Sequence, residues 1–125
     1  MIAPPTDAEF DELISWAMDE LPPERIRGLQ NIVITYADEP DEHQREKLKL
    51  RGDQLLLGLY EGIPLTKRGA GYNLVLPDKI TLFKNPLCQI AKDQDDFREQ
   101  IKHTLWHEIA HFYGLNHDDI RKREN

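Results

Sequence analysis

The sequence has one cysteine, Cys88, in its 125 residues, and it has no long hydrophobic run. A single cysteine cannot form an internal disulfide, which excludes a disulfide-stapled secreted fold and indicates a reducing compartment. We interpret Cys88 as a small buried apolar residue, with a role as metal ligand or nucleophile as the alternative. No stretch approaches the roughly 20 apolar residues that cross a bilayer, and the chain does not begin like a signal peptide. We therefore expect a soluble, cytoplasmic protein without a membrane partner.

An excess of basic charge is also missing, since the formal net charge is −7 at pH 7. Phosphate backbones bind clustered Lys and Arg on an exposed face, so we expect no nucleic-acid partner, although residues 121–123 form a short basic segment. The 39% of hydrophobic residues suffices for one modest core. Length and composition therefore predict a single domain that spans residues 1–125.

The segment from His107 to His117 carries the residues of a metal site. Residues four apart lie on nearly the same face of an α-helix, so His107 and His111 can direct two imidazole nitrogens at one ion. Glu108 follows one step round the helix, where it can hydrogen-bond a water on the metal and act as general base. Gly114 can adopt the left-handed conformation that ends a helix, which lets His117 approach as a third ligand.

The same segment could instead be an ordinary amphipathic helix with histidines on its surface or in its core. A helical wheel at about 100° per residue distinguishes the two interpretations. An arc of roughly 120° holds an apolar face, which consists of Phe97, Ile101, Leu105, Ile109 and Phe112. His107 and His111 fall beside this arc, and Glu108 lies at its margin. One helix is therefore expected to carry a core face and a flanking metal face.

At these residues the chain resembles the zincins, and the spacing His-Glu-x-x-His-x-x-Gly-x-x-His is the form that their metzincin branch has. Metzincins also have a methionine-containing turn beneath the metal, downstream of the third histidine. Here residues 118–125 follow His117, and the methionines are Met1 and Met18. We expect no such turn, so the chain departs from the metzincins in this respect.

A closer resemblance is to a small bacterial family of minimal zincin domains, described as possible zinc metallopeptidases. It extends over nearly the whole chain and includes the N-terminal helix, the motif helix and three further segments, at residues 21–24, 56–66 and 76–83. The resemblance implies an α+β fold of the minimal zincin type, with an N-terminal helix, a small mixed β-sheet of about three to four strands and a C-terminal active-site helix. It also implies one zinc ion per chain.

Local patterns predict the other elements. Thr6 and Glu9 have the spacing of a capping box, ahead of a helix expected from about Asp7 to Glu20, and Asp93 is the expected cap of the motif helix. Apolar and β-branched runs predict four strands and one short helical turn, namely strands at residues 32–36, 55–60, 72–76 and 79–84 and the turn at 85–90. The first of these strands is expected to be buried, because its β-branched run is too short for an amphipathic helix and is flanked by polar residues.

The structure of two further stretches, residues 37–53 and 66–76, is predicted from charge pattern and from analogy. Residues 37–53 are mostly charged and have no apolar period, so we expect a solvated loop or frayed helix, with a recognition surface as the alternative. By analogy with zincins, the edge strand that pairs with an extended substrate would lie at about residues 66–76.

Several residues compete for a place at the metal. Asp118 and Asp119 offer oxygen ligands that also suit zinc, but spacing and ligand type favour His117 as the third ligand. His103 lies two helical turns, about 12 Å, from His111, which is too far for one ion. We expect His103 to be exposed or to line the cleft. Three imidazoles favour zinc, with nickel, cobalt and iron as alternatives.

The pattern predicts metal-assisted hydrolysis of a peptide or protein substrate, with Glu108 as the catalytic base. Tyr60, Tyr72 and Tyr113 are candidates for stabilising the oxyanion, and the sequence does not choose between them. The main alternative is a zinc-binding interaction or regulatory domain without proteolysis, although a structural site needs no base and normally closes with four ligands. A zinc endoribonuclease ranks third, because the bacterial ribosomal-RNA maturation family that it would resemble lacks this glutamate and because the chain is acidic.

Overall fold

The computed structural model describes residues 1–69 and 77–115, which form an α+β fold. Its elements in chain order are α1 (Asp7–Glu20), α2 (Pro23–Ile26), β1 (Ile32–Ala37), α3 (Glu42–Lys47), β2 (Gly58–Glu61), the 3₁₀ helix η1 (Leu65–Lys67), β3 (Asp78–Phe83), α4 (Lys84–Ile90) and α5 (Gln94–Tyr113). The predicted fold class is confirmed, with an N-terminal helix, a small mixed sheet and a C-terminal motif helix. No helix in the two described ranges is long and apolar enough to cross a membrane.

The three strands form one mixed sheet in the order β1-β3-β2. β1 runs parallel to β3, with Ile34 opposite Ile80, and β2 runs antiparallel to it, with Tyr60 opposite Ile80. The central strand is covered by both neighbours, and its Ile80 and Leu82 are fully buried. β3 therefore connects the N-terminal half of the chain to β2, the strand next to the motif helix.

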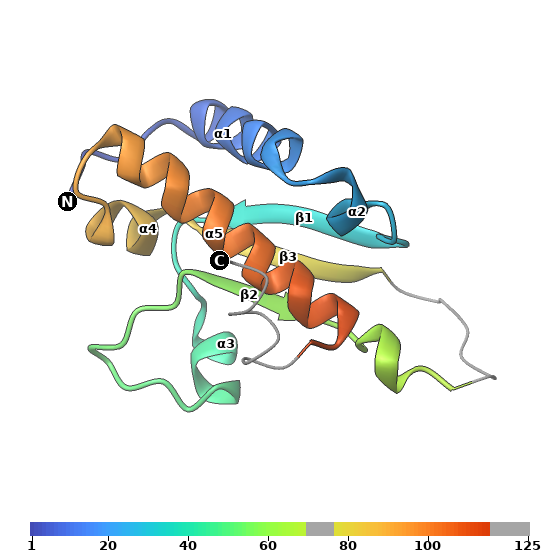
Figure 1. Cartoon of the computed structure of the whole chain (residues 1–125). Helices are drawn as coiled ribbons and strands as arrows, with labels where there is room; N and C mark the ends of the chain where they lie inside the picture. Colours follow the sequence, from blue (N-terminus) through green and yellow to red (C-terminus); the bar gives the residue numbers. More distant parts are fainter. Residues whose placement is uncertain (70–76, 116–125) are drawn as a thin grey trace.

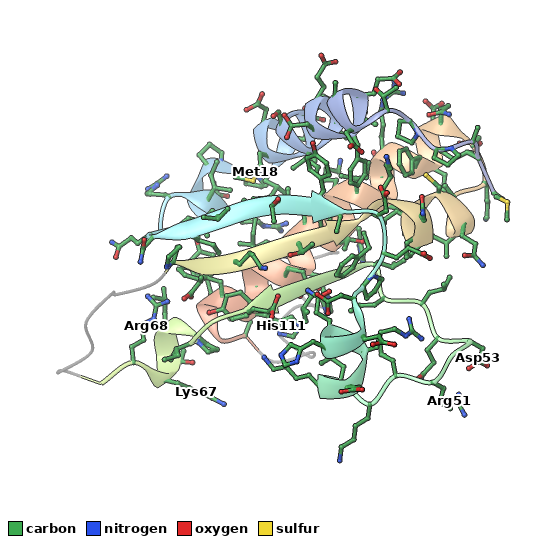
Figure 2. All side chains as sticks on the ribbon, turned by 180° about the vertical axis from the view of Figure 1, so that it is seen from behind. Met18, Arg51, Asp53, Lys67, Arg68 and His111 are labelled. Atoms are coloured by element: carbon green, nitrogen blue, oxygen red, sulfur yellow. The ribbon has the colours of Figure 1, made fainter. Side chains whose placement is uncertain are left out.

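α1 and α5 lie side by side on one face of this sheet (Figure 1). The apolar face predicted for α5 is confirmed, since all five of its residues are fully buried, and Phe10, Ile14 and Ala17 of α1 lie in the same core. Cys88 is also in this core, as expected for a small apolar residue. The opposite face of the sheet is turned to the viewer in Figure 2, and no helix of the described residues crosses it. Burial of this apolar face fixes the rotation of α5 and thereby the direction of the metal-binding flank beside it.

Both long helices begin at the predicted caps. The Thr6 hydroxyl accepts a hydrogen bond from the Glu9 amide, and the Glu9 carboxylate accepts one from the Thr6 amide. The Asp93 carboxylate accepts a hydrogen bond from the Asp96 amide at the start of α5. At the other end, Gly114 is left-handed with φ 83° and terminates the helix. The sequence therefore sets both ends of α5 by local chemistry.

Three strand predictions need correction. The strand expected at residues 55–60 begins at Gly58 and continues to Glu61, because pairing with β3 sets its limits rather than apolarity. The strand expected at 79–84 is β3, shifted by one residue, since Lys84 already begins α4. The strand expected to be buried at 32–36 is β1, at the side of the described sheet, where Val33 is 46% exposed.

The predictions for residues 37–53 and 66–76 are corrected in part. Within residues 37–53 the chain forms α3, which a capping box between Asp41 and Gln44 begins. The edge strand expected at 66–76 is wrong at its start, because Pro64 precedes the 3₁₀ turn η1 there. Residues 70–76, with the strand expected at 72–76, lie outside the described ranges. In the described sheet, β2 is the outer strand on the side of the motif residues.

Candidate metal centre

Helix α5 brings His107, Glu108 and His111 together on the flank that faces β2. Their ligand atoms, one from each side chain, all lie within 4.8 Å of one another. The two imidazoles are half-buried, whereas Glu108 is only 7% exposed. Figure 2 shows His111 beside β2 on the side away from β3. The arrangement is the one that the helical wheel predicts, with the metal face next to the core face.

The two imidazoles are spaced as ligands of one zinc ion would be. Their Nε2 atoms are 3.1 Å apart, and the ring planes meet at 81°. Nitrogen ligands on a tetrahedral zinc with Zn–N distances near 2.0–2.1 Å lie roughly 3.3 Å apart. The same spacing allows an N–H···N hydrogen bond between neutral rings, whose tautomers decide which ring donates. Spacing and donor type both fit zinc.

Burial raises the pKa of Glu108 to about 7. The opposing influence is a hydrogen bond that the carboxylate accepts from the Tyr60 backbone amide, which lowers the pKa. A carboxyl group with a pKa near 7 can both accept and release a proton near neutral pH, as a general base that later acts as an acid must. The environment of Glu108 therefore suits proton transfer.

The register of β2 explains why the Tyr60 amide is available to Glu108. The Phe83 amide donates to the Leu57 carbonyl, so these two residues form a hydrogen-bonded pair of the antiparallel ladder. Such pairs alternate with pairs whose backbone groups point away from the partner strand. Gly58 and Tyr60 are in the second class, so their amides and carbonyls point outward from β3. The outer side of β2 is thus the side on which the Glu108 carboxylate lies.

Gly58 allows β2 to lie unusually close to α5. A β-carbon on Gly58 would be 2.7 Å from Thr104 Cγ2, 3.2 Å from Leu82 Cδ2 and 3.3 Å from Glu108 Cγ. A side chain at this position would force the strand and the helix apart. Gly58 was not among the site residues predicted from the sequence, although an isolated glycine inside a strand indicates either a bulge or a close backbone approach.

A cavity of about 270 Å³ adjoins these residues. Leu56 and Leu57 line its apolar part, and Thr104 and Glu108 line the side toward α5. The exposed His103 also lines it, which agrees with the expected cleft-lining role. The candidate metal site therefore opens into a partly apolar cavity large enough for a side chain of a substrate.

The family model described as Zincin-like metallopeptidase matches residues 29–125. The chain belongs to this family. A solved structure of a conserved hypothetical protein from Thermus thermophilus is similar in fold, with 22% sequence identity and a TM-score of 0.57 over 94% of this chain and 99% of that one. A comparison with curated proteins finds no match.

Two of the three tyrosine candidates in this zincin-like chain have hydroxyls that bind elsewhere. The Tyr60 hydroxyl donates to Asp78 Oδ2 at 2.6 Å, and burial followed by the Asp78 carboxylate raises its pKa. The Tyr113 hydroxyl donates to the Arg25 carbonyl at 2.5 Å. Tyr72 lies outside the described ranges. Both described tyrosines have structural partners, which argues against a role for either as oxyanion stabiliser.

The third ligand falls beyond the described part of this zincin-like chain. His117 and its competitors Asp118 and Asp119 all lie in residues 116–125. The left-handed turn at Gly114 is in place just before them, and a β-carbon there would overlap the side chain of Thr66. The family membership and the two described imidazoles support zinc as the metal.

Proposed function

We propose that this zincin-like protein is a single-domain zinc metallopeptidase that hydrolyses peptide bonds. One observation carries the proposal: two Nε2 atoms 3.1 Å apart share a helix flank with the buried carboxyl of Glu108, directly beside an outer strand. A purely structural zinc site has no use for a buried, proton-exchanging carboxyl group at this position. The family to which the chain belongs supports the same interpretation.

In this proposal His107 and His111 hold one zinc ion per chain, and His117 completes the set, with Asp118 or Asp119 as the alternative third ligand. Zinc bound there would acidify a water molecule and polarise the carbonyl of the scissile bond. The chain keeps the two described imidazoles at ligand spacing by placing them one turn apart on a rigid, core-anchored helix.

Glu108 is the proposed general base. Its carboxylate takes a proton from the attacking water and delivers that proton to the leaving amine. A pKa raised to about 7 by burial makes both transfers feasible near neutral pH. The Tyr60 amide holds the carboxylate by a hydrogen bond and so limits its rotation.

The outer side of β2 positions the substrate in this proposal. The amide and carbonyl of Gly58 and the carbonyl of Tyr60 point outward from the sheet, and an extended peptide can pair with such groups as an added strand while the Tyr60 amide stays on Glu108. A side chain of that peptide would enter the cavity between Leu57 and Thr104. A peptide or protein substrate fits these features better than a compact small molecule.

Metal analysis is the first test. We expect about one zinc per chain in the purified protein by mass spectrometry, and loss of that zinc in His107→Ala, His111→Ala and His117→Ala. Retention of zinc in His117→Ala but not in Asp118→Ala or Asp119→Ala would transfer the third-ligand role to an aspartate. A protein that takes up no zinc would contradict the proposal.

Peptide cleavage is the second test. A mixture of unstructured peptides, analysed by mass spectrometry after incubation, should contain cleavage products with wild-type protein and none above background with Glu108→Gln. Both proteins should hold the same amount of zinc, because Glu108 is not a proposed ligand. If wild-type and Glu108→Gln proteins bind zinc equally and neither cleaves, a non-catalytic zinc-binding domain becomes the better interpretation.

A further inference from the structure

A buried carboxylate, Asp78, lies at the start of β3 and serves two donors. Its side chain is 4% exposed, and its Oδ2 accepts hydrogen bonds from the Tyr60 hydroxyl at 2.6 Å and from Arg68 Nη2 at 2.5 Å. Arg68 is itself only 9% exposed. Asp78 therefore joins β3 to β2 and to the segment that follows η1.

The partners of Asp78 also contact the end of α5. The Tyr60 ring meets the Phe112 ring edge-to-face with centroids 6.2 Å apart, and the Arg68 guanidinium lies 5.4 Å from the same ring centroid. Arg68 further donates from Nε to the Ile63 carbonyl at 2.8 Å. Figure 2 shows Arg68 beside η1, at the end of the sheet near this helix terminus. The Asp78 carboxylate on β3 thus binds β2 and the segment after η1 directly, and it reaches α5 through the contacts of Tyr60 and Arg68 with Phe112. Phe112 is the residue next to His111.

Tyr60 links this cluster to the candidate base. Its side chain is held by Asp78 and Phe112, while its backbone amide donates to the Glu108 carboxylate. A rotation or shift of β2 at Tyr60 would move this amide away from Glu108. The hydrogen bond from the Tyr60 hydroxyl to Asp78 therefore restricts the position of the Tyr60 amide, which donates to Glu108.

We propose that Asp78 is a positioning residue of the site, whose buried carboxylate fixes Tyr60 and Arg68 and thereby holds the Tyr60 amide against Glu108 and the end of α5 in place. This inference rests on the proposed function, since it gives Glu108 its role. Removing two charges from water is costly, and a buried ion pair often stabilises a fold no more than apolar residues of the same size would. We infer that the Asp78–Arg68 pair instead fixes the relative positions of β2, β3 and the end of α5.

Amide hydrogen exchange measured by NMR on the zinc-free protein tests the proposal without metal or substrate. Asp78→Asn removes the charge that holds Arg68, and Tyr60→Phe removes only the hydroxyl. We expect the amide of residue 60 to exchange at least tenfold faster in Asp78→Asn, and by a smaller factor in Tyr60→Phe, relative to the Leu82 amide of the same variant. Dividing by the exchange rate of the Leu82 amide corrects for any change in global stability.

Ile14→Ala is the matched control, because Ile14 lies in the core on α1 and its truncation lowers stability at a distance from β2. It should leave the ratio of the two exchange rates unchanged. If Asp78→Asn does not fold, Tyr60→Phe still tests the link, since its ring and backbone remain. An unchanged ratio in Tyr60→Phe and in folded Asp78→Asn would overturn the proposal and leave Asp78 a purely structural residue.

The cobalt-substituted protein gives a second readout. We expect the visible d–d bands of bound Co²⁺ to shift in Asp78→Asn at saturating metal, and not in Ile14→Ala, because the former alters the position of the helix end that carries His111. Bands identical to wild type in Asp78→Asn would contradict the proposed effect on the helix end. Neither readout depends on peptide cleavage, so an inactive wild-type protein would refute the proposed function while leaving the exchange test decisive.

Discussion

A β-carbon on Gly58 would lie 2.7 Å from Cγ2 of Thr104, closer than two carbon atoms can pack. Thr104 is buried on α5 and is β-branched, so its side chain has little freedom to move away. Gly58→Ala should therefore push β2 from α5 and lower the free energy of unfolding by about 1–3 kcal/mol, as overpacking does in other cores. Urea denaturation followed by circular dichroism measures this loss.

A second substitution provides the control for Gly58→Ala. Thr104→Ser removes the Cγ2 methyl that the new β-carbon would meet, so the double variant should recover part of the lost stability. The two substitutions should be non-additive by roughly 0.5–3 kcal/mol, as expected for residues in contact. Strict additivity would show that Thr104 is not what excludes a side chain at position 58.

Glu108 makes the stability of the zinc-free protein depend on pH. Its pKa is raised from 4.5 to about 7 in the folded state, so the folded protein holds a proton that the unfolded chain has lost between these values. Stability should fall as pH rises through this window and become level above it, for a total on the order of 3 kcal/mol. Glu108→Gln has no such ionisation.

The comparison of Glu108→Gln with wild type isolates this effect, because all other titrating groups are shared. In the presence of a chelator, the free energy of unfolding of the variant should rise relative to that of wild type as the pH increases from 4 to 8. The difference between the two proteins should then stay nearly constant from pH 8 to pH 9. Thermal unfolding at each pH measures the difference. A constant difference across the whole range would show that Glu108 titrates normally.

The motif helix could be predicted from sequence because its signals are local. Asp93 and Gly114 set its ends through neighbouring backbone groups, and the spacing of His107 and His111 acts within one turn. The apolar face follows from helical periodicity alone. The two helix ends and the apolar face were confirmed, because these features need no knowledge of the rest of the chain.

The features that the sequence analysis missed depend on tertiary contacts. Asp78 follows a proline and has the pattern of a turn residue, yet it begins β3 and binds Arg68, which lies ten positions earlier, directly after η1. Gly58 is an isolated glycine whose importance depends on Thr104 across the sheet–helix interface. Val33 is exposed because it points to the face of the sheet that no described helix covers, whereas its neighbours Ile32 and Ile34 pack against the core. Which face stays uncovered cannot be deduced from the strand's own run of residues.

Two buried cations, Lys84 and Arg68, should differ sharply in what their ion pairs contribute to stability. Lys84 Nζ lies 2.8 Å from Asp7 and 3.4 Å from Asp38, but these carboxylates are 69% and 68% exposed and remain solvated when the amine is removed. Lys84→Met should therefore cost no more than about 1 kcal/mol. Asp78→Asn leaves the Arg68 guanidinium buried beside a neutral partner and should cost about 2–4 kcal/mol.

Chemical denaturation of both variants under identical conditions measures this contrast. The order of the two losses matters more than either value, because each loss depends on how buried the charged group is that remains after the substitution. Equal losses would show that the exposure of the carboxylates does not govern what these ion pairs contribute to stability.

Tyr113 connects the end of α5 to α2 and should be dispensable for catalysis. Its hydroxyl donates to the Arg25 carbonyl at 2.5 Å, and burial raises its pKa, so it is a structural donor rather than a free group facing the metal residues. Tyr113→Phe should lower the free energy of unfolding by about 1 kcal/mol, the usual net value of one such hydrogen bond. Peptide cleavage per zinc-loaded chain should stay within twofold of wild type, whereas removal of an oxyanion donor reduces kcat by about 10²–10³-fold. A loss of that size, with zinc content unchanged, would identify Tyr113 as the oxyanion stabiliser and would require its hydroxyl to leave Arg25 when substrate binds.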